Sequence, residues 1–111
     1  MNVSISSHVL NLELGKPAAG LEITLSQGEA DDFVLLERAV TDGDGRVGRW
    51  ELVCKAGVTL RMSFATAAWF EANGQSVFYP QVHVDFCPNE TGHYHIPLLL
   101  NRHGYSTYRG S

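Results

Sequence analysis

The last nineteen residues, 93–111, constrain the fold more than any other stretch, because a strand pattern there places histidines on one face. Side chains on a β-strand alternate between its two faces. The first face carries Tyr94, Ile96, Leu98 and Leu100, and the other carries His93, His95 and Pro97. This pattern predicts a strand that buries one side in a core and presents imidazoles on the other.

The chain ends on a second strand-like segment. After a turn at 102–104, the residues Tyr105 to Tyr108 are aromatic and rich in hydroxyl groups, and the sequence then stops at Tyr-Arg-Gly-Ser. Chain ends usually fray and tolerate change. A terminus with this much specific chemistry is therefore a candidate part of a functional site.

The rest of the chain is dominated by short alternating runs between turn signals, which is typical of an all-β sandwich with seven or eight strands. Strands are expected at 3–10, 21–26, 33–40, 47–50, 58–64 and 78–86, with a loop at 11–19 and a polar connection at 27–32. One short helix is expected at 65–73, where Thr66 can act as N-cap and Asn73-Gly74 can end the helix.

Composition and charge exclude several classes of protein. The chain has 111 residues, 44% of them hydrophobic, which predicts a single domain over 1–111 with one core. The formal charge is -4 and the eight Lys and Arg residues are scattered, which argues against nucleic-acid binding. No apolar run approaches the roughly 20 residues that span a bilayer.

The cysteines and the start of the chain predict a cytoplasmic protein. The first residues lack the charged and apolar regions of a signal peptide. In such a chain, Cys54 and Cys87 are expected to be reduced thiols and not a structural disulfide.

Residues 41–46, Thr-Asp-Gly-Asp-Gly-Arg, predict a tight turn, because glycine adopts positive φ angles at no steric cost. An Asp-x-Asp-Gly string is also found in calcium loops. Such a loop needs further oxygen ligands and a glutamate at a fixed distance, and Glu51 does not have that spacing. The pattern therefore indicates a turn that leads Arg46 into a strand.

Four positions are candidates for chemistry: His8, Arg46, His95 and the terminal segment of Tyr108, Arg109, Gly110 and Ser111. Each has an ordinary alternative, because His8 and His95 could be solvated strand residues and Arg46 a surface cation. The same alternative applies more strongly to His83, next to Asp85 on an outer strand face, and to His103 in a turn.

The histidines allow two readings of function. His8, His93 and His95 could supply three zinc ligands if their faces converge, although no CxxC or HExxH spacing supports a metal site. Alternatively, imidazoles exchange protons near neutral pH, and two of them with an arginine could hydrolyse a cyclic amide. One histidine would take a proton from water, and arginine would stabilise the developing oxyanion.

Three motifs resemble one known family. Residues 7–11 (Ser-His-Val-Leu-Asn) with 15–18 (Gly-Lys-Pro-Ala) resemble the opening of 5-hydroxyisourate hydrolases, the transthyretin-related enzymes of purine catabolism. Residues 41–46 look like their Asp-Gly-Arg turn. Residues 93–100 with 105–111, which end in Tyr-Arg-Gly-Ser, are similar to their closing motif. The resemblance spans essentially the whole chain.

The resemblance implies a transthyretin-like β-sandwich of two four-stranded sheets with one short helix, assembled as a homotetramer with a central channel. It implies hydrolysis of 5-hydroxyisourate to 2-oxo-4-hydroxy-4-carboxy-5-ureidoimidazoline without a cofactor. His8 and His95 would position and deprotonate water, Arg46 would polarise the substrate, and Tyr108 to Ser111 would close the pocket. Which imidazole is the base stays open, as does the role of His93. The alternative is a transthyretin-like carrier of a small ligand, because fold does not fix function.

Overall fold

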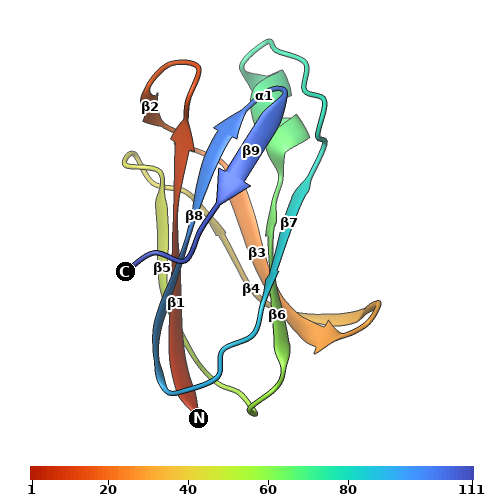
Figure 1. Cartoon of the computed structure of the whole chain (residues 1–111). Helices are drawn as coiled ribbons and strands as arrows, with labels where there is room; N and C mark the ends of the chain where they lie inside the picture. Colours follow the sequence, from red (N-terminus) through yellow and green to blue (C-terminus); the bar gives the residue numbers. More distant parts are fainter.

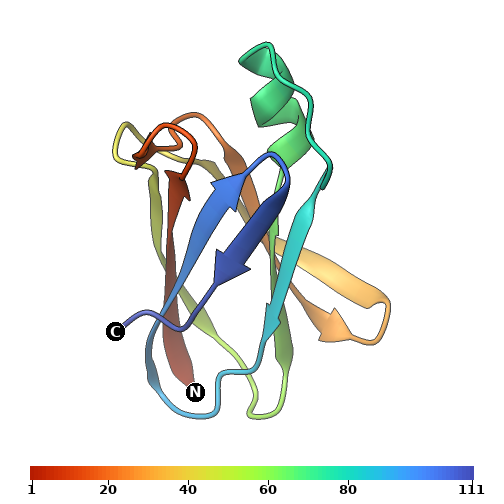
Figure 2. The same ribbon diagram turned by 45° about the horizontal axis from the view of Figure 1, so that its top comes forward.

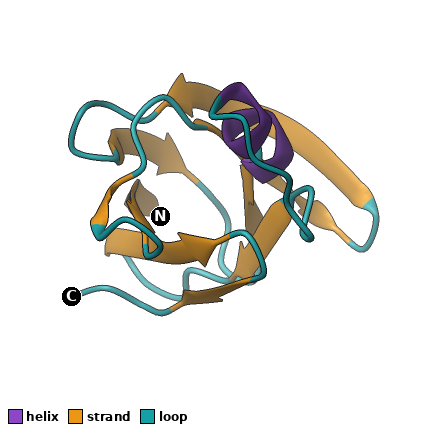
Figure 3. Ribbon diagram, turned by 90° about the horizontal axis from the view of Figure 1, so that it is seen from above, coloured by secondary structure: helices purple, strands orange, loops and turns teal.

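The computed structural model describes all residues from Met1 to Ser111, and its strands form two facing sheets (Figure 1). The first sheet contains β1 (Asn2–Asn11), β2 (Lys16–Pro17), β5 (Arg46–Val53), β8 (Gly92–Asn101) and β9 (Gly104–Thr107). The second sheet contains, in spatial order, β4 (Asp32–Val40), β3 (Glu22–Glu29), β6 (Thr59–Phe64) and β7 (Val82–Phe86). The helix α1 (Thr66–Ala72) follows β6 and lies at the end of this second layer (Figure 3). The predicted all-β sandwich is confirmed, but the first sheet has five strands instead of four because the two-residue β2 joins it.

Strands β1 and β8 lie side by side in parallel at the centre of the first sheet. On the other side of β1, β5 pairs along most of its length and the two-residue β2 pairs with its end. Strand β9 returns along β8 as an edge strand. The two chain ends are therefore brought together in the middle of one sheet, although they are far apart in sequence.

The alternation predicted for β1 and β8 matches their burial. In β1 the side chains of Val3, Ile5, Ser7 and Val9 are buried, and in β8 those of Tyr94, Ile96, Leu98 and Leu100 are buried. All of these except Ser7 belong to a core of 18 buried hydrophobic side chains between the two sheets. Burial of this apolar surface is the main favourable term in folding, and it fixes which faces of β1 and β8 point outward.

The segment before β7 differs from the prediction. A strand was expected from Phe78, but β7 begins at Val82 and residues 78–81 are irregular. Proline at position 80 has no N–H to donate to a ladder. The carbonyl of Pro80 instead accepts from Ala67 N, and Phe78 N donates to Arg102 O. The segment is therefore held by the helix and by the β8–β9 turn.

Two smaller predictions were also wrong. Thr66 is the first residue of α1, not its N-cap: Ala65 occupies the cap without a side-chain hydrogen bond, and Thr66 Oγ1 donates to Tyr79 O. The polar connection expected at 27–32 is a hairpin whose turn is only Ala30–Asp31, since β3 continues to Glu29. This hairpin projects away from the rest of the sandwich (Figure 2). The seven-residue α1 is the molecule's only helix, and it is far too short to cross a bilayer.

Candidate active site

The site begins with the outward faces of β1 and β8. In the parallel register, Ser4 lies beside His93, Ser6 beside His95, and His8 beside Pro97. Because side chains alternate along each strand, all of these project from the face opposite the core, where Pro97 is itself buried. Because β1 and β8 each bury one face in the core, their other faces place histidines from the two ends of the chain on one surface.

The turn between β4 and β5 brings a guanidinium to the same surface. Asp42 Oδ1 accepts hydrogen bonds from the backbone N–H groups of Asp44, at 2.9 Å, and Arg46, at 3.0 Å. Donation from Arg46 N is the main reason that the pKa of Asp42 lies below its ordinary 3.8. The turn delivers Arg46 directly opposite His8 in the β1–β5 ladder.

Gly45 is required in this turn. Its φ is +76°, a conformation that side chains disfavour. A Cβ at this position would lie 2.4 Å from the carbonyl oxygen of Val9. The close approach lets Gly45 O accept from Val9 N at 2.8 Å, which ties the turn to β1.

The same turn orients His8. Its Nε2 lies 2.8 Å from the backbone carbonyl oxygen of Asp44. A carbonyl can only accept, so Nε2 carries the proton and donates, and Nδ1 keeps its lone pair. A neutral His8 is therefore held with an unprotonated Nδ1.

His95 is the most constrained of the predicted residues. Its Nδ1 lies 2.8 Å from Ser6 Oγ. Burial lowers the pKa of His95 below its ordinary 6.5, and the nearby positive charges of Arg46, His8 and His93 lower it further. The fold thus gathers three basic side chains around one partly buried imidazole, and it favours the neutral form of that imidazole.

The C-terminal tail passes close to β8 (Figures 1 and 2), and Gly110 forms an isolated antiparallel bridge with His95. Gly110 N donates to His95 O at 2.8 Å. Only glycine fits there, because a Cβ on residue 110 would lie 2.5 Å from His95 Cδ2. The Tyr-Arg-Gly-Ser end is therefore held against the site by a backbone hydrogen bond, and the lack of a side chain at Gly110 allows this close approach.

Two pockets flank His95, and they divide the predicted residues. Arg46, His95 and Ser111 line a pocket of about 550 Å³. Tyr108 and Arg109 line a smaller one of about 270 Å³ that also contacts His95. His8 lies beside the larger pocket, next to Arg46, without being part of its wall. The structure therefore brings His8, Arg46, His95 and Ser111 to one side and places Tyr108 and Arg109 on the other.

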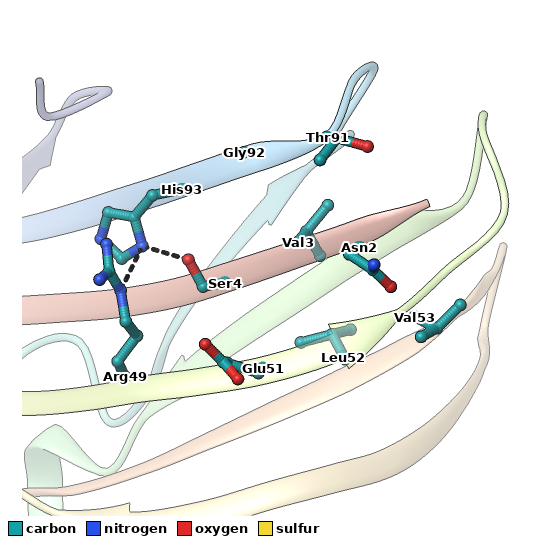
Figure 4. Close-up of a pocket in the computed structure, with 10 residues that line it drawn as sticks. All are labelled: Asn2, Val3, Ser4, Arg49, Glu51, Leu52, Val53, Thr91, Gly92 and His93. Atoms are coloured by element: carbon teal, nitrogen blue, oxygen red, sulfur yellow. Dashed lines mark hydrogen bonds between the residues drawn. The ribbon is translucent and has the colours of Figure 1, made fainter.

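Three further side chains, those of Ser6, His93 and Arg49, belong to this surface. Of these, the sequence pattern had indicated only His93 as a candidate for chemistry. Ser6 Oγ lies 2.8 Å from His93 Nε2, and Arg49 Nε donates to His93 Nδ1 at 3.3 Å. Arg49 and His93 line both the 550 Å³ pocket and a neighbouring one of about 670 Å³, which Figure 4 shows. Strand alternation places Ser6 on the face of His8 and could have identified it.

Arg49 could not be found by alternation. Positions 46 and 49 of a regular strand would point to opposite faces. The β1–β5 register shifts between Ile5 and Ser7, so that Gly48 and Arg49 together oppose Ser6. An extra residue of this kind is a β-bulge, which re-aims the side chains that follow it. The bulge accounts for both arginines facing the same pocket.

The zinc reading gains no support from the geometry. No three His, Cys, Asp or Glu side chains are grouped so that they could hold a metal ion. Both ring nitrogens of His93 and Nδ1 of His95 are instead engaged by serine hydroxyls. Cys54 is buried, Cys87 is exposed, and both are free thiols.

Comparison with known proteins identifies the family. The model of the HIUase/Transthyretin family matches residues 5–110. The chain belongs to this family. A 5-hydroxyisourate hydrolase from Salmonella dublin is 40% identical over 112 residues, which cover 99% of this chain and 82% of that protein.

Solved structures agree with the family assignment. The 5-hydroxyisourate hydrolase of Klebsiella pneumoniae superposes with a TM-score of 0.84 at 30% identity, covering 97% of this chain and 99% of that one. Sea bream transthyretin in complex with thyroxine has the same TM-score at 26% identity, covering 96% and 93%. The expected transthyretin-like fold is therefore confirmed, and both a hydrolase and a thyroxine-binding protein share it.

Proposed function

We propose that this protein hydrolyses 5-hydroxyisourate to 2-oxo-4-hydroxy-4-carboxy-5-ureidoimidazoline in purine catabolism. The observation that carries the proposal is the convergence of His8, Arg46 and His95 on one sheet face. The relatives named as 5-hydroxyisourate hydrolases support the same substrate.

The residues divide the work of opening a ring amide. A neutral imidazole takes a proton from water as the water oxygen attacks the ring carbonyl carbon. The Arg46 guanidinium, which has no carboxylate partner in the chain, stabilises the oxyanion that develops. The C–N bond then breaks, the ring nitrogen receives a proton, and a carboxylate remains. The lowered pKa of His95 keeps this ring neutral at physiological pH. We propose that the reaction needs no metal or cofactor.

The terminal residues close the site in this proposal. Ser111 lies in the wall of the larger pocket, and Tyr108 and Arg109 lie in the wall of the smaller one. Because the pocket opens on the outer face of the first sheet, we propose that a homotetramer, a dimer of dimers, encloses it between protomers. We also propose that the enzyme works in the cytoplasm, where its two free thiols stay reduced.

The test is the decay of freshly made 5-hydroxyisourate, followed by its ultraviolet absorbance. We expect rapid decay with the wild-type protein and an unchanged rate after treatment with a chelator. His8→Ala and His95→Ala should each lower kcat by about 10²–10⁴-fold, the usual contribution of general acid–base catalysis. The matched control is His83→Ala, an exposed histidine on β7 bonded only to Ser63, which should be nearly silent.

A carrier would give a different result. If wild-type protein left the substrate decaying no faster than in buffer, the hydrolase proposal would fail and small-molecule binding would become the better explanation. The polar lining argues against a carrier of apolar ligands, because His95, Arg46 and Arg49 all face the same pocket.

A further inference from the structure

A continuous chain of side-chain hydrogen bonds runs from Arg49 through His93 and Ser6 to His95. We propose that Ser6, His93 and Arg49 are positioning residues that hold His95 in a single tautomer, with its proton on Nε2. The tautomer is a property of the structure alone. Its catalytic consequence rests on the proposed hydrolase function.

The first part of the chain fixes His93. Arg49 Nε donates to His93 Nδ1 at 3.3 Å, and Ser4 Oγ lies 2.7 Å from the same nitrogen (Figure 4). A guanidinium can only donate, so Nδ1 of His93 is the unprotonated nitrogen. Burial and the charge of Arg49 both lower the pKa of His93, which keeps the ring neutral. Its single proton is therefore on Nε2.

Ser6 links the position of the ring proton of His93 to that of His95. Its Oγ lies 2.8 Å from His93 Nε2 and 2.8 Å from His95 Nδ1. The hydroxyl accepts from the Nε2–H of His93, and it uses its own proton to donate to His95 Nδ1. The neutral His95 then carries its proton on Nε2.

The donor and acceptor order of these hydrogen bonds gives His95 and His8 different roles in the proposed reaction. His95 offers an N–H, whereas His8 donates its Nε2–H to Asp44 O and offers the lone pair of Nδ1. In the proposed reaction His8 Nδ1 takes the proton of the attacking water and returns it to the leaving ring nitrogen. The Nε2–H of His95 donates a hydrogen bond to the carbonyl oxygen as it becomes an oxyanion, alongside Arg46.

The decisive experiment is a ¹⁵N imidazole correlation spectrum of the full-length protein above pH 7. This spectrum distinguishes an Nε2–H ring from an Nδ1–H ring. We expect wild-type His95 to give the Nε2–H pattern. Ser6→Ala removes the donor to Nδ1, so His95 should become a mixture of tautomers, and Ser6→Thr, which keeps the hydroxyl, should restore the single pattern.

Kinetics of the same variants give the second measurement. Ser6→Ala should lower kcat by about 10–100-fold, the same range as the loss of an outer hydrogen-bond partner of a metal-binding histidine, with KM changed less than twofold. The matched control is Ser63→Ala, because Ser63 Oγ holds His83 Nδ1 at 2.7 Å on the other sheet. It should leave the His95 pattern and kcat unchanged, and the His83 signals in Ser6→Ala report that this variant is folded.

The outcomes separate the two proposals. An Nδ1–H pattern for wild-type His95, or a Ser6→Ala protein with an unaltered pattern and kcat, would overturn the role of the chain. A wild-type protein with the Nε2–H pattern but no action on 5-hydroxyisourate would retain the tautomer and reject the hydrolase function.

Discussion

At the scale of single residues, the site depends on one imidazole kept uncharged among cations. His95 is partly buried, and a proton on its ring would have to be accommodated beside Arg46, His8 and His93. Desolvation and like charges both disfavour the charged form of a histidine. His95 therefore remains a neutral hydrogen-bonding group under conditions in which a solvated histidine would begin to protonate.

This environment makes a prediction about titration. An NMR pH titration should place the midpoint of His95 below 6.5. Arg46→Gln removes a neighbouring positive charge and should move the midpoint upward. The same shift makes the free energy of unfolding depend on pH. Because the pKa of His95 is lower in the folded state, the unfolded state binds the proton more readily, and stability falls as pH drops below 6.5. A midpoint above 6.5 in the wild-type protein would contradict the burial of the ring.

A second prediction concerns the one residue of the tail that touches His95 through its backbone. Gly110→Ala would put a Cβ 2.5 Å from His95 Cδ2, so either the tail or the ring must move. A displacement of about 1 Å in a catalytic group can cost roughly 10²-fold in rate, and we expect a loss of that order in kcat/KM. Gly104→Ala is the control, since its Cβ would meet only Asn101 Oδ1, at 4.0 Å; equal losses in the two variants would refute the steric argument.

At the scale of elements, the β4–β5 turn acts as the support of the site. Asp42 accepts two backbone hydrogen bonds, and the turn then carries both Arg46 and the carbonyl that holds His8. Asp42→Ala should therefore reduce kcat/KM at least tenfold, the scale on which misplaced catalytic groups act, while the strands stay folded. Asp31→Ala, in the turn of the other sheet, should leave the hydrolysis rate unchanged. Steady-state kinetics with circular dichroism would check both, and a fully active Asp42→Ala protein would contradict this role.

Elements also mark the limit of what the sequence could predict. Alternation alone located β1 and β8 and assigned their faces, because both strands bury one side. It placed His8 and His95 outward but could not place Arg49, which faces the pocket only because of the bulge at Gly48. It also extended β7 back to Phe78, because the contacts that hold 78–81 come from α1 and from the β8–β9 turn. Local patterns predict faces, whereas bulges and loop partners depend on the assembled fold.

At the scale of the whole molecule, the site is made from both ends of the chain. Ser6 and His95 are 89 positions apart and are joined by one hydrogen bond across the parallel β1–β8 pair. Pairing segments so far apart in sequence carries a loop-closure cost that the contacts of the assembled sheet must offset. The geometry of the candidate site and the packing of the core therefore depend on the same two strands, and a truncation that removes either strand is expected to abolish both.

Several exposed apolar side chains lie at one end of the sandwich. Leu14 is 67% exposed in the loop after β1, Phe78 is 72% exposed, and Tyr105 is 43% exposed. The Glu13–Arg102 ion pair at 3.1 Å ties this loop to the β8–β9 turn, and Phe78 N donates to Arg102 O. The three side chains thus lie at one end of the sandwich, and we propose that this exposed apolar surface contacts another protomer of the proposed tetramer.

This gives a prediction for the assembly. The wild-type protein should sediment as a tetramer of 12.2 kDa chains. Leu14→Asp should shift it toward smaller species, because a carboxylate buried at an interface is strongly unfavourable. Val34→Asp is the matched control, since Val34 is 66% exposed on β4 of the other sheet. If the site lies between protomers, activity should fall with the tetramer fraction across a dilution series of Leu14→Asp; a monomer with full activity would instead show that one chain completes the site.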